Sequence, residues 1–373
     1  MSDMPELVVR RGLVHVVSAF DVGFSIDLAR SKQLLSDLTE VASIKHKGHA
    51  PTYFQFDPPP LRMAKEIAPL EIGARRTAPS VDLTVYDFGG LSVSHTVPFA
   101  GTFEELIGLS CALVGSDQFV TDSRRHAADL LRVIESAVER ANVAEATEED
   151  YLIFVLEDVQ GASNIEDFWT RHAPATARLL RSERDALSEQ EIADAMATRV
   201  SFGRDDVALL DWNAALLVDR EPEDVRLVLE FANLQLLEAR FLDAALDRAL
   251  DRSYELVSRQ RRFGALGPSG SRADLARIGS FEVEGAILFE RVGNALKLVG
   301  DQYLARVYRA ASQRFRLAEW NAGILRKLET IESIYRKVQD RASGARAEAL
   351  EWIIIALIAF EVFLSFWPGL RGG

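Results

Sequence analysis

Three short acidic clusters provide residue types that could bind a divalent cation. They are Glu148-Glu149-Asp150, Glu157-Asp158 and Asp205-Asp206. Carboxylate oxygens are ligands that Ca²⁺ and Mg²⁺ prefer, so convergence of two clusters would predict a metal-dependent hydrolase. Such residues more often cap helices or line solvated turns. The clusters therefore leave a metal-dependent enzyme as one alternative, and they identify no catalytic, cofactor-binding or metal site.

Nitrogen and sulfur ligands are sparse in the sequence. His46 and His49 lie beside Lys45 and Lys47 with no carboxylate in the same stretch, which is weak evidence for a metal site. A lone cysteine, Cys111, forms no internal disulfide and no multi-cysteine metal site. The sequence contains no Walker loop, no dinucleotide glycine fingerprint, no nucleophile-elbow serine and no His-Glu-x-x-His motif. We therefore expect no cofactor.

The charge is unevenly distributed along the chain. The net charge is −13, whereas residues 301–350 hold 10 Lys or Arg and 6 Asp or Glu, a balance of +4. An acidic body disfavours non-specific nucleic-acid binding, so we expect no DNA partner. The basic stretch, with Arg306, Arg309, Arg314 and Arg316, is where a ribosome or RNA would be tethered.

The elements of the first 160 residues alternate between strand and helix patterns. We expect an α+β domain over residues 1–160. Its strands are predicted over 8–24, over 151–155 and in a hairpin over 81–97 that turns at Gly89 and Gly90. Its helices are predicted over 26–42 and 123–141, with another that begins at Thr102. Glu105, three residues later, completes a capping box there.

Beyond Gln160 the strand signal stops, and a helical domain is predicted over residues 161–348. Short helices are expected over 165–205, and a long helix begins after Pro222, which suits the first helical position. The Gly264–Gly270 stretch reads as a loop, and a second long helical region follows over 274–340. Two long helices joined by a Gly/Pro loop favour an antiparallel hairpin.

The second helical region contains a heptad seam. One series spaced by seven is Leu317, Ile324, Ile331 and Val338, and its companion series is Asn321, Leu328 and Tyr335. This a/d pattern is typical of coiled coils, with a polar residue at one core position. The seam is interpreted either as intramolecular packing against the helix after Pro222 or as a surface for self-association.

An apolar segment near the end of the chain predicts a membrane anchor over 349–368. Leu350–Trp367 contains 11 Leu, Ile, Val or Phe residues and would extend roughly 27 Å as a helix, close to the thickness of a bilayer core. Trp352 and Trp367 suit aromatic belts at its two ends. Glu361 lies near the middle, and we hypothesise that it supports assembly rather than catalysis.

Basic residues precede this segment, namely Arg336, Lys337, Arg341 and Arg346. The positive-inside tendency then predicts a tail-anchored, single-pass protein of the inner (cytoplasmic) membrane, with its body in the cytoplasm.

Two strings near the C-terminus carry a family resemblance. L-A-R-V-Y-R-A-A-S-Q-R-F-R-L-A-E-W at residues 304–320 and L-E-W-I-I-I-A-L-I-A-F-E-V at 350–362 resemble the domain-of-unknown-function 155 family. That family includes YagE-like bacterial proteins and the "required for meiotic nuclear division" proteins of eukaryotes. The resemblance implies a membrane-anchored, self-assembling protein, and mitochondrial relatives are associated with organelle translation. It implies no catalytic residues.

These observations combine into one expected architecture and function. The fold class is an α+β N-terminal domain, then a mainly α region with a long helical hairpin, then a C-terminal transmembrane helix. We expect a membrane-anchored scaffold or interaction protein without catalysis of its own. Its partners would be the lipid bilayer and further copies of the chain. One alternative is a membrane tether for a ribosome or RNA, whose partner would be the ribosome or another protein. The other alternative is a metal-dependent enzyme that uses the acidic clusters.

Overall fold

The chain divides into two compact units in the computed structural model. Unit 1 comprises Met1–Phe241 and Leu288–Asn321, and unit 2 comprises Leu242–Ile287 and Ala322–Gly373. The structure describes the following residues: 6–37, 44–45, 55–56, 58–114, 116–141, 148–162, 164–263, 296–297, 302–334, 336–337, 354–355 and 357–358.

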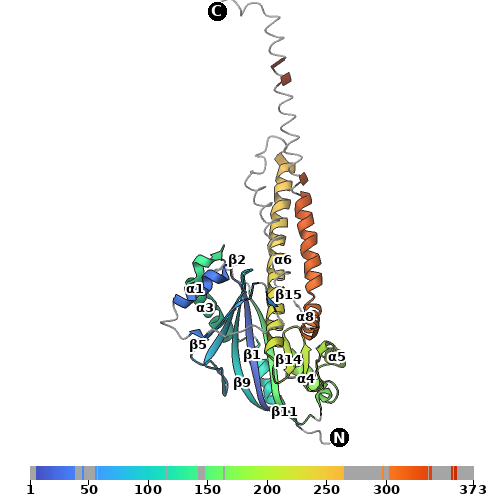
Figure 1. The fold of residues 1–373 in the computed structure, drawn as a ribbon. Helices are drawn as coiled ribbons and strands as arrows, with labels where there is room; N and C mark the ends of the chain where they lie inside the picture. The colour runs from blue at the N-terminus through green and yellow to red at the C-terminus, as the bar shows by residue number, and fades with distance from the viewer. Residues whose placement is uncertain are drawn as a thin grey trace, which may run out of the picture. The chain divides into compact units, whose positions relative to one another are not determined.

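Unit 1 is built on a nine-stranded sheet in the order β12-β13-β14-β11-β1-β9-β8-β5-β3 (Figure 1). The strands are β1 (Val8–Asp21), β3 (Ile44–Lys45), β5 (Leu61–Glu66), β8 (Ser80–Val85), β9 (Gly90–Thr102), β11 (Glu148–Gln160), β12 (Arg199–Val200), β13 (Val207–Leu210) and β14 (Ala214–Val218). Strands β11 and β14 are parallel, and the other neighbours are antiparallel. The sheet is therefore mixed, and the N-terminal domain is α/β, so the expected α+β class is wrong.

Three two-stranded sheets accompany the large one. They pair β2 (Ser25–Ile26) with β10 (Val138–Glu139), β4 (Gln55–Phe56) with β15 (Leu296–Lys297), and β6 (Glu71–Ile72) with β7 (Arg75–Arg76). The helices are α1 (Leu28–Asp37), α2 (Phe103–Leu113), α3 (Asp117–Ile134), α4 (Ala173–Arg181), α5 (Glu189–Ala195), α6 (Glu223–Phe263) and α8 (Gln302–Arg314), with short 3-10 turns at Glu135–Ala137 and Ile165–Phe168.

Both faces of the large sheet are covered. Because side chains alternate along a strand, Val17 and Ala19 of β1 face one side, and they join a core made with α6 and α8. Val16 and Phe20 face the other side, where they join the cores made with α1 to α5. Figure 1 shows α1 and α3 on the opposite side of the sheet from α6. Unit 1 is thus a three-layer domain with the sheet in the middle.

Several local predictions are confirmed. The side chain of Thr102 accepts from the backbone N–H of Glu105, and the Glu105 carboxylate accepts from the N–H of Thr102, which completes the capping box of α2. Strands β8 and β9 form the predicted hairpin, and α6 begins directly after Pro222. Each of these signals depends on residues close together in sequence, so tertiary packing had little opportunity to override it.

The expectation that strands stop at Gln160 is wrong. Strands β12, β13 and β14 all lie beyond it, and β13 and β14 extend the large sheet. Their sequences, V-A-L-L and A-A-L-L-V, are short apolar runs without alternation, and nearly all their residues are buried. A strand covered on both faces has no period-two signal, and periodicity alone does not distinguish it from a buried helical segment.

The expectation of an antiparallel helical hairpin is also wrong. A second helix spans residues 317–334 after a break at Arg316, whose φ is +52°. In unit 2, Asp243 lies 3.9 Å from the position of a Cβ on Gly323, and Lys327 Nζ lies 2.7 Å from carboxylate oxygens of both Asp243 and Asp247. Residues later in α6 thus contact residues later in the second helix. The two helices run parallel, side by side (Figure 1).

The predicted transmembrane anchor is a further correction. Within the part of the chain that the structure describes, no helix is both long enough and apolar enough to cross a membrane. Helix α6 is long, with 41 residues, but charged residues recur along it. The prediction of a transmembrane helix is therefore wrong, as are the tail-anchored topology and the inner-membrane location derived from it. Trp352, Glu361 and Trp367 lie outside the described residues.

Gly89 offers a test of the tight approach between the β8–β9 turn and the end of β1. Its φ is +98°, and a Cβ there would lie 1.7 Å from the carbonyl oxygen of Gly23. We expect Gly89→Ala to lower the free energy of unfolding by several kcal/mol, about 1–3 kcal/mol of which is backbone strain. Urea denaturation followed by circular dichroism measures the change.

Gly73→Ala is the matched control. Gly73 also has a positive φ, +58°, but nothing lies within 4 Å of its Cβ position. We expect it to lose only about 1–2 kcal/mol. Equal losses in the two variants would contradict the steric argument for Gly89.

Candidate metal centre

Three metal-ligating side chains converge inside unit 1. One donor atom from each of His95, Asp122 and His126 lies within 4.8 Å of the other two, and all three residues are buried. Nε2 of His95 and Nε2 of His126 each lie 3.0 Å from Oδ2 of Asp122. Donors bound to one tetrahedral Zn²⁺ lie about 3.4 Å apart, so this spacing is close to that of a coordinated set.

A strand and a helix position these side chains. His95 lies on β9, an even number of residues after Leu91 and Val93. Its side chain therefore points to the same face as theirs, toward the helical layer that contains α3. Asp122 and His126 are four residues apart on α3, which places both on one face of that helix. The ring of His95 also packs edge-on against Phe119, with centroids 5.4 Å apart. The packing of α3 on the sheet therefore assembles the cluster.

Both histidines favour the neutral form that a metal requires. Burial lowers the pKa of His95 to about 4, although the Asp122 carboxylate acts in the opposite direction. Burial also lowers the pKa of His126. A metal ligand must be a deprotonated ring nitrogen, so neither histidine has to lose a charge before it can coordinate.

Two ring nitrogens of the cluster form no hydrogen bond with the described residues. Nε2 of His126 is close to Asp122 Oδ2, but the two atoms do not have hydrogen-bond geometry, and Nε2 is buried. Nδ1 of His95 is likewise buried without a partner. A buried polar atom left without a partner requires an explanation. The Asp122 carboxylate, 3.0 Å from Nε2 of His126, gives that nitrogen an electrostatic partner.

Lys65 and Arg125 supply positive charge around the cluster. Lys65 Nζ lies 3.2 Å from Nδ1 of His126 and 3.3 Å from Oδ2 of Asp129, and Arg125 donates to Oδ1 of Asp122. An ammonium only donates, so Nδ1 of His126 accepts and the ring proton is on Nε2. A metal at Nε2 requires that proton to sit on Nδ1, so Lys65 must turn toward Asp129. Lys65 therefore competes with a metal.

A cavity of about 400 Å³ opens beside the cluster. It is lined by Leu70, Asp117, Gln118, Thr121, Asp122 and Arg125. Asp122 belongs both to this lining and to the cluster, so it connects the buried histidines to the cavity. A metal held by three protein ligands keeps a position for water or substrate, as in catalytic sites.

Comparison with known protein families assigns the N-terminal part of this chain to one of them. Residues 11–224 match the family model described as "Uncharacterized protein MJ0711, N-terminal domain". The chain belongs to the MJ0711 N-terminal domain family. The matched range includes every member of the cluster and all the strands from β2 to β14. The expected membership of the domain-of-unknown-function 155 family is therefore wrong, because its motifs lay near the C-terminus, outside the segment that defines the family.

One relative of this family is Uncharacterized protein MJ0711 of Methanocaldococcus jannaschii. It is 25% identical over 206 residues, which cover 54% of this chain and 62% of the relative. The chain thus matches less than two thirds of that relative's length. No solved structure matches the chain significantly.

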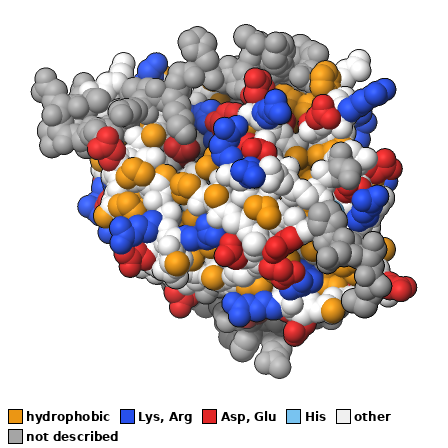
Figure 2. Space-filling view, turned by 90° about the horizontal axis from the view of Figure 1, so that it is seen from below, with side chains coloured by type: hydrophobic (Ala, Val, Ile, Leu, Met, Phe, Trp, Pro, Cys, Tyr) orange, Lys and Arg blue, Asp and Glu red, His pale blue; other side chains and the backbone are white. Residues whose placement is uncertain are grey.

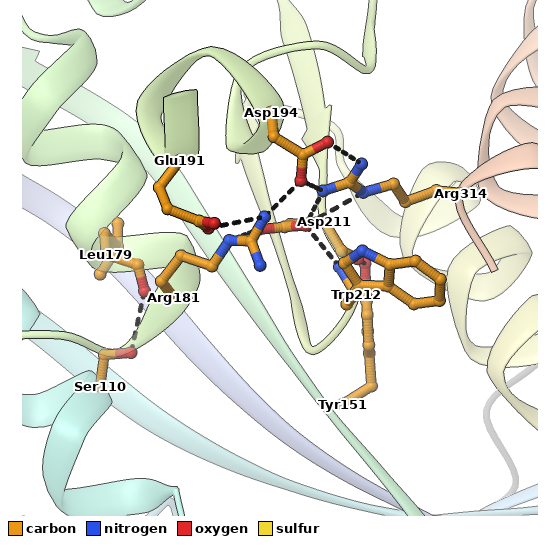
Figure 3. A network of polar contacts seen from close by, with 9 residues as sticks. All are labelled: Ser110, Tyr151, Leu179, Arg181, Glu191, Asp194, Asp211, Trp212 and Arg314. Carbon is orange, nitrogen blue, oxygen red and sulfur yellow. Dashed lines mark hydrogen bonds and ion pairs between the residues drawn. The ribbon is translucent and has the colours of Figure 1, made fainter. Parts of the chain in front are cut away.

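A second polar network in this MJ0711-family domain is structural. Asp211, fully buried at the end of β13, lies between two guanidinium groups (Figure 3). Nε of Arg181 is 2.7 Å from its Oδ2, and Nε of Arg314 donates to its Oδ1 at 3.0 Å. Hydrogen bonds from Arg314 lower the pKa of Asp194, which contacts both arginines. The network links α4, α5 and α8 to one strand end.

The predicted acidic clusters do not converge. Glu148 is bidentate with Arg124, Glu149 pairs with Arg240, and Glu157 pairs with Arg11. Asp206 accepts from the backbone N–H groups of Phe202 and Gly203. These carboxylates are thus occupied by ion pairs and turn contacts. His46 and His49 lie outside the described residues.

The predicted seam is buried within a single chain where the structure describes it. Leu317, Ile324, Leu328 and Ile331 are all buried, and Asn321 is half-buried. Tyr335, Val338, Arg341 and Arg346 lie outside the described residues. Arg336 pairs with Glu332, and Lys337 is exposed.

Two of the basic residues proposed for tethering are engaged within the chain. Arg314 is taken up by Asp194 and Asp211, and Arg306 donates to the carbonyl of Ser201. Figure 2 shows one face on which Lys, Arg, Asp and Glu side chains are interspersed rather than gathered by sign.

Sequence reasoning missed His95, Asp122 and His126. The pair Asp122 and His126, four apart on a helix, was the available signal. The predicted helix began at Ser123, one residue after Asp122, whereas α3 begins at Asp117. His95 comes from a strand, and only the tertiary packing of α3 brings it to the pair.

Asp211 generates a stability prediction. We expect Asp211→Ala to destabilise unit 1 by about 3–5 kcal/mol, because it leaves Arg314 and Arg181 without their shared buried partner. Asp194→Ala removes a half-exposed carboxylate from the same network and should lose about 1 kcal/mol or less. Chemical denaturation measures both changes, and similar values for the two would show that the burial of Asp211 has no special importance.

Proposed function

We propose that the N-terminal domain binds one divalent transition-metal ion through His95, Asp122 and His126, and that this ion acts on a small molecule in the adjacent cavity. The convergence of the three donors within 4.8 Å supports the proposal. Two imidazoles and one carboxylate, with positions left open, are typical of Zn²⁺ hydrolytic sites and of non-haem Fe²⁺ sites. The domain would thus be a metal-dependent enzyme, although its ligands are not the acidic clusters.

The choice of metal class follows from the donors. Imidazole nitrogen suits Zn²⁺, Fe²⁺ and Co²⁺, whereas Ca²⁺ and Mg²⁺ prefer sites made of oxygen. The cavity contributes Arg125, Gln118 and Thr121 as hydrogen-bond donors beside the open positions. A small anion that coordinates the metal with one oxygen and contacts Arg125 with another fits this lining.

Metal titration tests the proposal. Co²⁺ reports both stoichiometry and geometry through its visible absorption, so we expect one equivalent per chain with a tetrahedral or five-coordinate spectrum. His95→Ala and His126→Ala should each weaken binding by at least tenfold, because each removes a ligand. Isothermal titration calorimetry with Zn²⁺ provides the affinity.

His172→Ala is the matched control, since His172 is also a buried histidine but lies outside the cluster. It should leave the affinity unchanged, whereas Lys65→Gln should raise it on the order of tenfold by removing the competing ammonium. Wild-type chain that binds no Co²⁺ at millimolar concentration would refute the proposal. Equal affinity in the His126→Ala variant would do the same.

A second candidate function is self-assembly as a scaffold, which one observation in unit 2 favours. Ile354, Ile355, Leu357 and Ile358 are helical and expose 53%, 53%, 61% and 55% of their surfaces. Four exposed large apolar side chains within five residues form the kind of patch that a protein partner covers. We propose a second copy of the chain as that partner. The buried seam residues do not contribute to this proposal.

Light scattering coupled to size exclusion tests self-assembly. We expect the wild-type chain to form a dimer or larger oligomer at micromolar concentration. Replacing both Ile355 and Ile358 by Ser should shift it toward monomer by removing apolar contact area. Leu325→Ser is the control, because Leu325 is an exposed leucine outside this group of four residues. A monomeric wild-type chain would contradict this candidate.

A further inference from the structure

Asp21, the last residue of β1, is a buried carboxylate on the face of the sheet that α6 covers. It lies an even number of residues after Val17 and Ala19, so its side chain points to the same face as theirs. Val17 and Ala19 belong to the core formed with α6. Its register partner on β9 is Gly90, which has no side chain. Asp21 is 4% exposed, and the backbone N–H of Gly23 donates to it.

Glu238 brings a second carboxylate to the same place from α6. One helical turn earlier, Leu234 contacts Gly90 so closely that a Cβ there would lie 2.5 Å from Leu234 Cδ2. Glu238 is 3% exposed, and neither of its carboxylate oxygens has a hydrogen-bond partner among the described residues. Burial raises the pKa of Glu238, and the charge of Asp21 raises it further. Two buried carboxyl groups thus lie at the same part of the contact between β1 and α6.

The charged groups of the neighbouring elements are engaged elsewhere. From β11, Glu149 pairs with Arg240 of α6, and its backbone carbonyl accepts from Asn233. Asp150 is the register partner of Ser18 on β1, and Glu148 pairs with Arg124 of α3. From α8, the hydroxyl of Tyr308 donates to Gln235. In this part of unit 1, Arg240 is therefore already neutralised by Glu149, and neither Asp21 nor Glu238 shows an ion pair with a basic side chain.

Two carboxylates that are buried together cannot both ionise at low energetic cost. Each would lose its hydration, and each would repel the other in a medium of low dielectric constant. A positive side chain would relieve the repulsion, but none is paired with them in the described structure. The remaining solution of low energetic cost is to keep one of the two groups protonated, so that the pair carries one charge instead of two.

We propose that Asp21 and Glu238 form a buried proton-binding site that makes the packing of α6 on β1 depend on pH. At neutral pH the pair holds one proton, so only one of the two groups is charged. Loss of this proton leaves two negative charges in the contact and weakens it. The site is independent of the histidine cluster, which lies on the opposite face of the sheet.

The direction of the pH effect follows from proton linkage. Burial raises the pKa of Glu238, and it raises the pKa of Asp21 from 3.8 to about 7. The folded pair therefore retains protons that the unfolded carboxyl groups have already lost. Stability conferred by these protons is fully present below pH 4, falls as the pH rises, and is lost above about pH 7.

The test compares the pH dependence of unfolding in the wild-type chain and in Glu238→Gln. For one retained proton, the unfolding equilibrium constant rises by up to about tenfold per pH unit, so we expect this slope in the wild type between pH 5 and 7. Glu238→Gln should flatten it, because the amide cannot ionise. Asp251→Asn removes an exposed acid of α6 and should retain the wild-type slope.

Hydrogen exchange of α6 localises the effect. The amides of residues 234–241 should exchange faster at pH 8 than at pH 6, after correction for intrinsic rates, and this difference should vanish in Glu238→Gln. Carboxyl-carbon NMR of the wild-type chain keeps the test valid if that variant does not fold. One titration midpoint near 7 is expected for the pair.

Three results would overturn the proposal. The first is an unchanged slope in Glu238→Gln, and the second is a midpoint below 5 for every Asp and Glu of the wild type. The third is strong stabilisation of the wild type by Ca²⁺ or Mg²⁺ at pH 8 that is absent in Glu238→Gln, because it would identify a cation site instead.

Discussion

Strand β1 is the constraint on which the rest of unit 1 depends. It is hydrogen-bonded to β9 on one edge and to β11 on the other, and both of its faces are covered. Alternation then assigns each side chain to one of two layers. Val16 and Phe20 face the layer that contains α3, whereas Val17, Ala19 and Asp21 face α6. A slip of one residue would exchange the two sets, so the apolar residues on both faces fix the register together.

The same register determines where the chemistry lies. His95 pairs with Val16 across the β1–β9 ladder, and its side chain points toward α3 together with that of Val16. Asp21 pairs with Gly90 five residues earlier on β9 and points toward α6. One antiparallel pairing thus places a histidine cluster on one face and a carboxyl pair on the other. The two sites share a scaffold but no side chain.

The elements that sequence reasoning recovered are those with a local signal. The Thr102–Glu105 capping box, the Gly89–Gly90 turn and the start of α6 after Pro222 need only nearby residues. The strands β13 and β14 are buried on both faces and carry no alternation, so their pattern resembled that of a helical segment. The parallel course of α6 and the helix over 317–334 has no signal in residues that are close together in sequence.

The candidate site was less accessible to sequence reasoning than the fold. Asp122 and His126 are separated by one helical turn, but a helix with this spacing of polar residues is common. His95 completes the set only through the packing of α3 on β9. The apolar segment at Leu350–Trp367 gave a stronger signal than any of these residues, and it dominated the functional interpretation because hydropathy is additive along the sequence. The residues of a convergent site are distant in sequence, so no single segment adds their contributions together.

Helix α6 shows why Glu238 is unusual rather than simply buried. Glu230 is equally buried on the same helix, two turns earlier, and it accepts from Arg226, which is itself buried and pairs with Glu223. Arg62 extends that cluster from β5. The charge of Glu230 is thus matched by a cation that the same helix supplies four residues away. At Glu238 the corresponding neighbours are Leu234 and Leu242, so the helix supplies no cation, and the nearby Arg240 is held by Glu149. One helix therefore buries the same side chain in two ways, and only at Glu238 is a proton left to balance the charge.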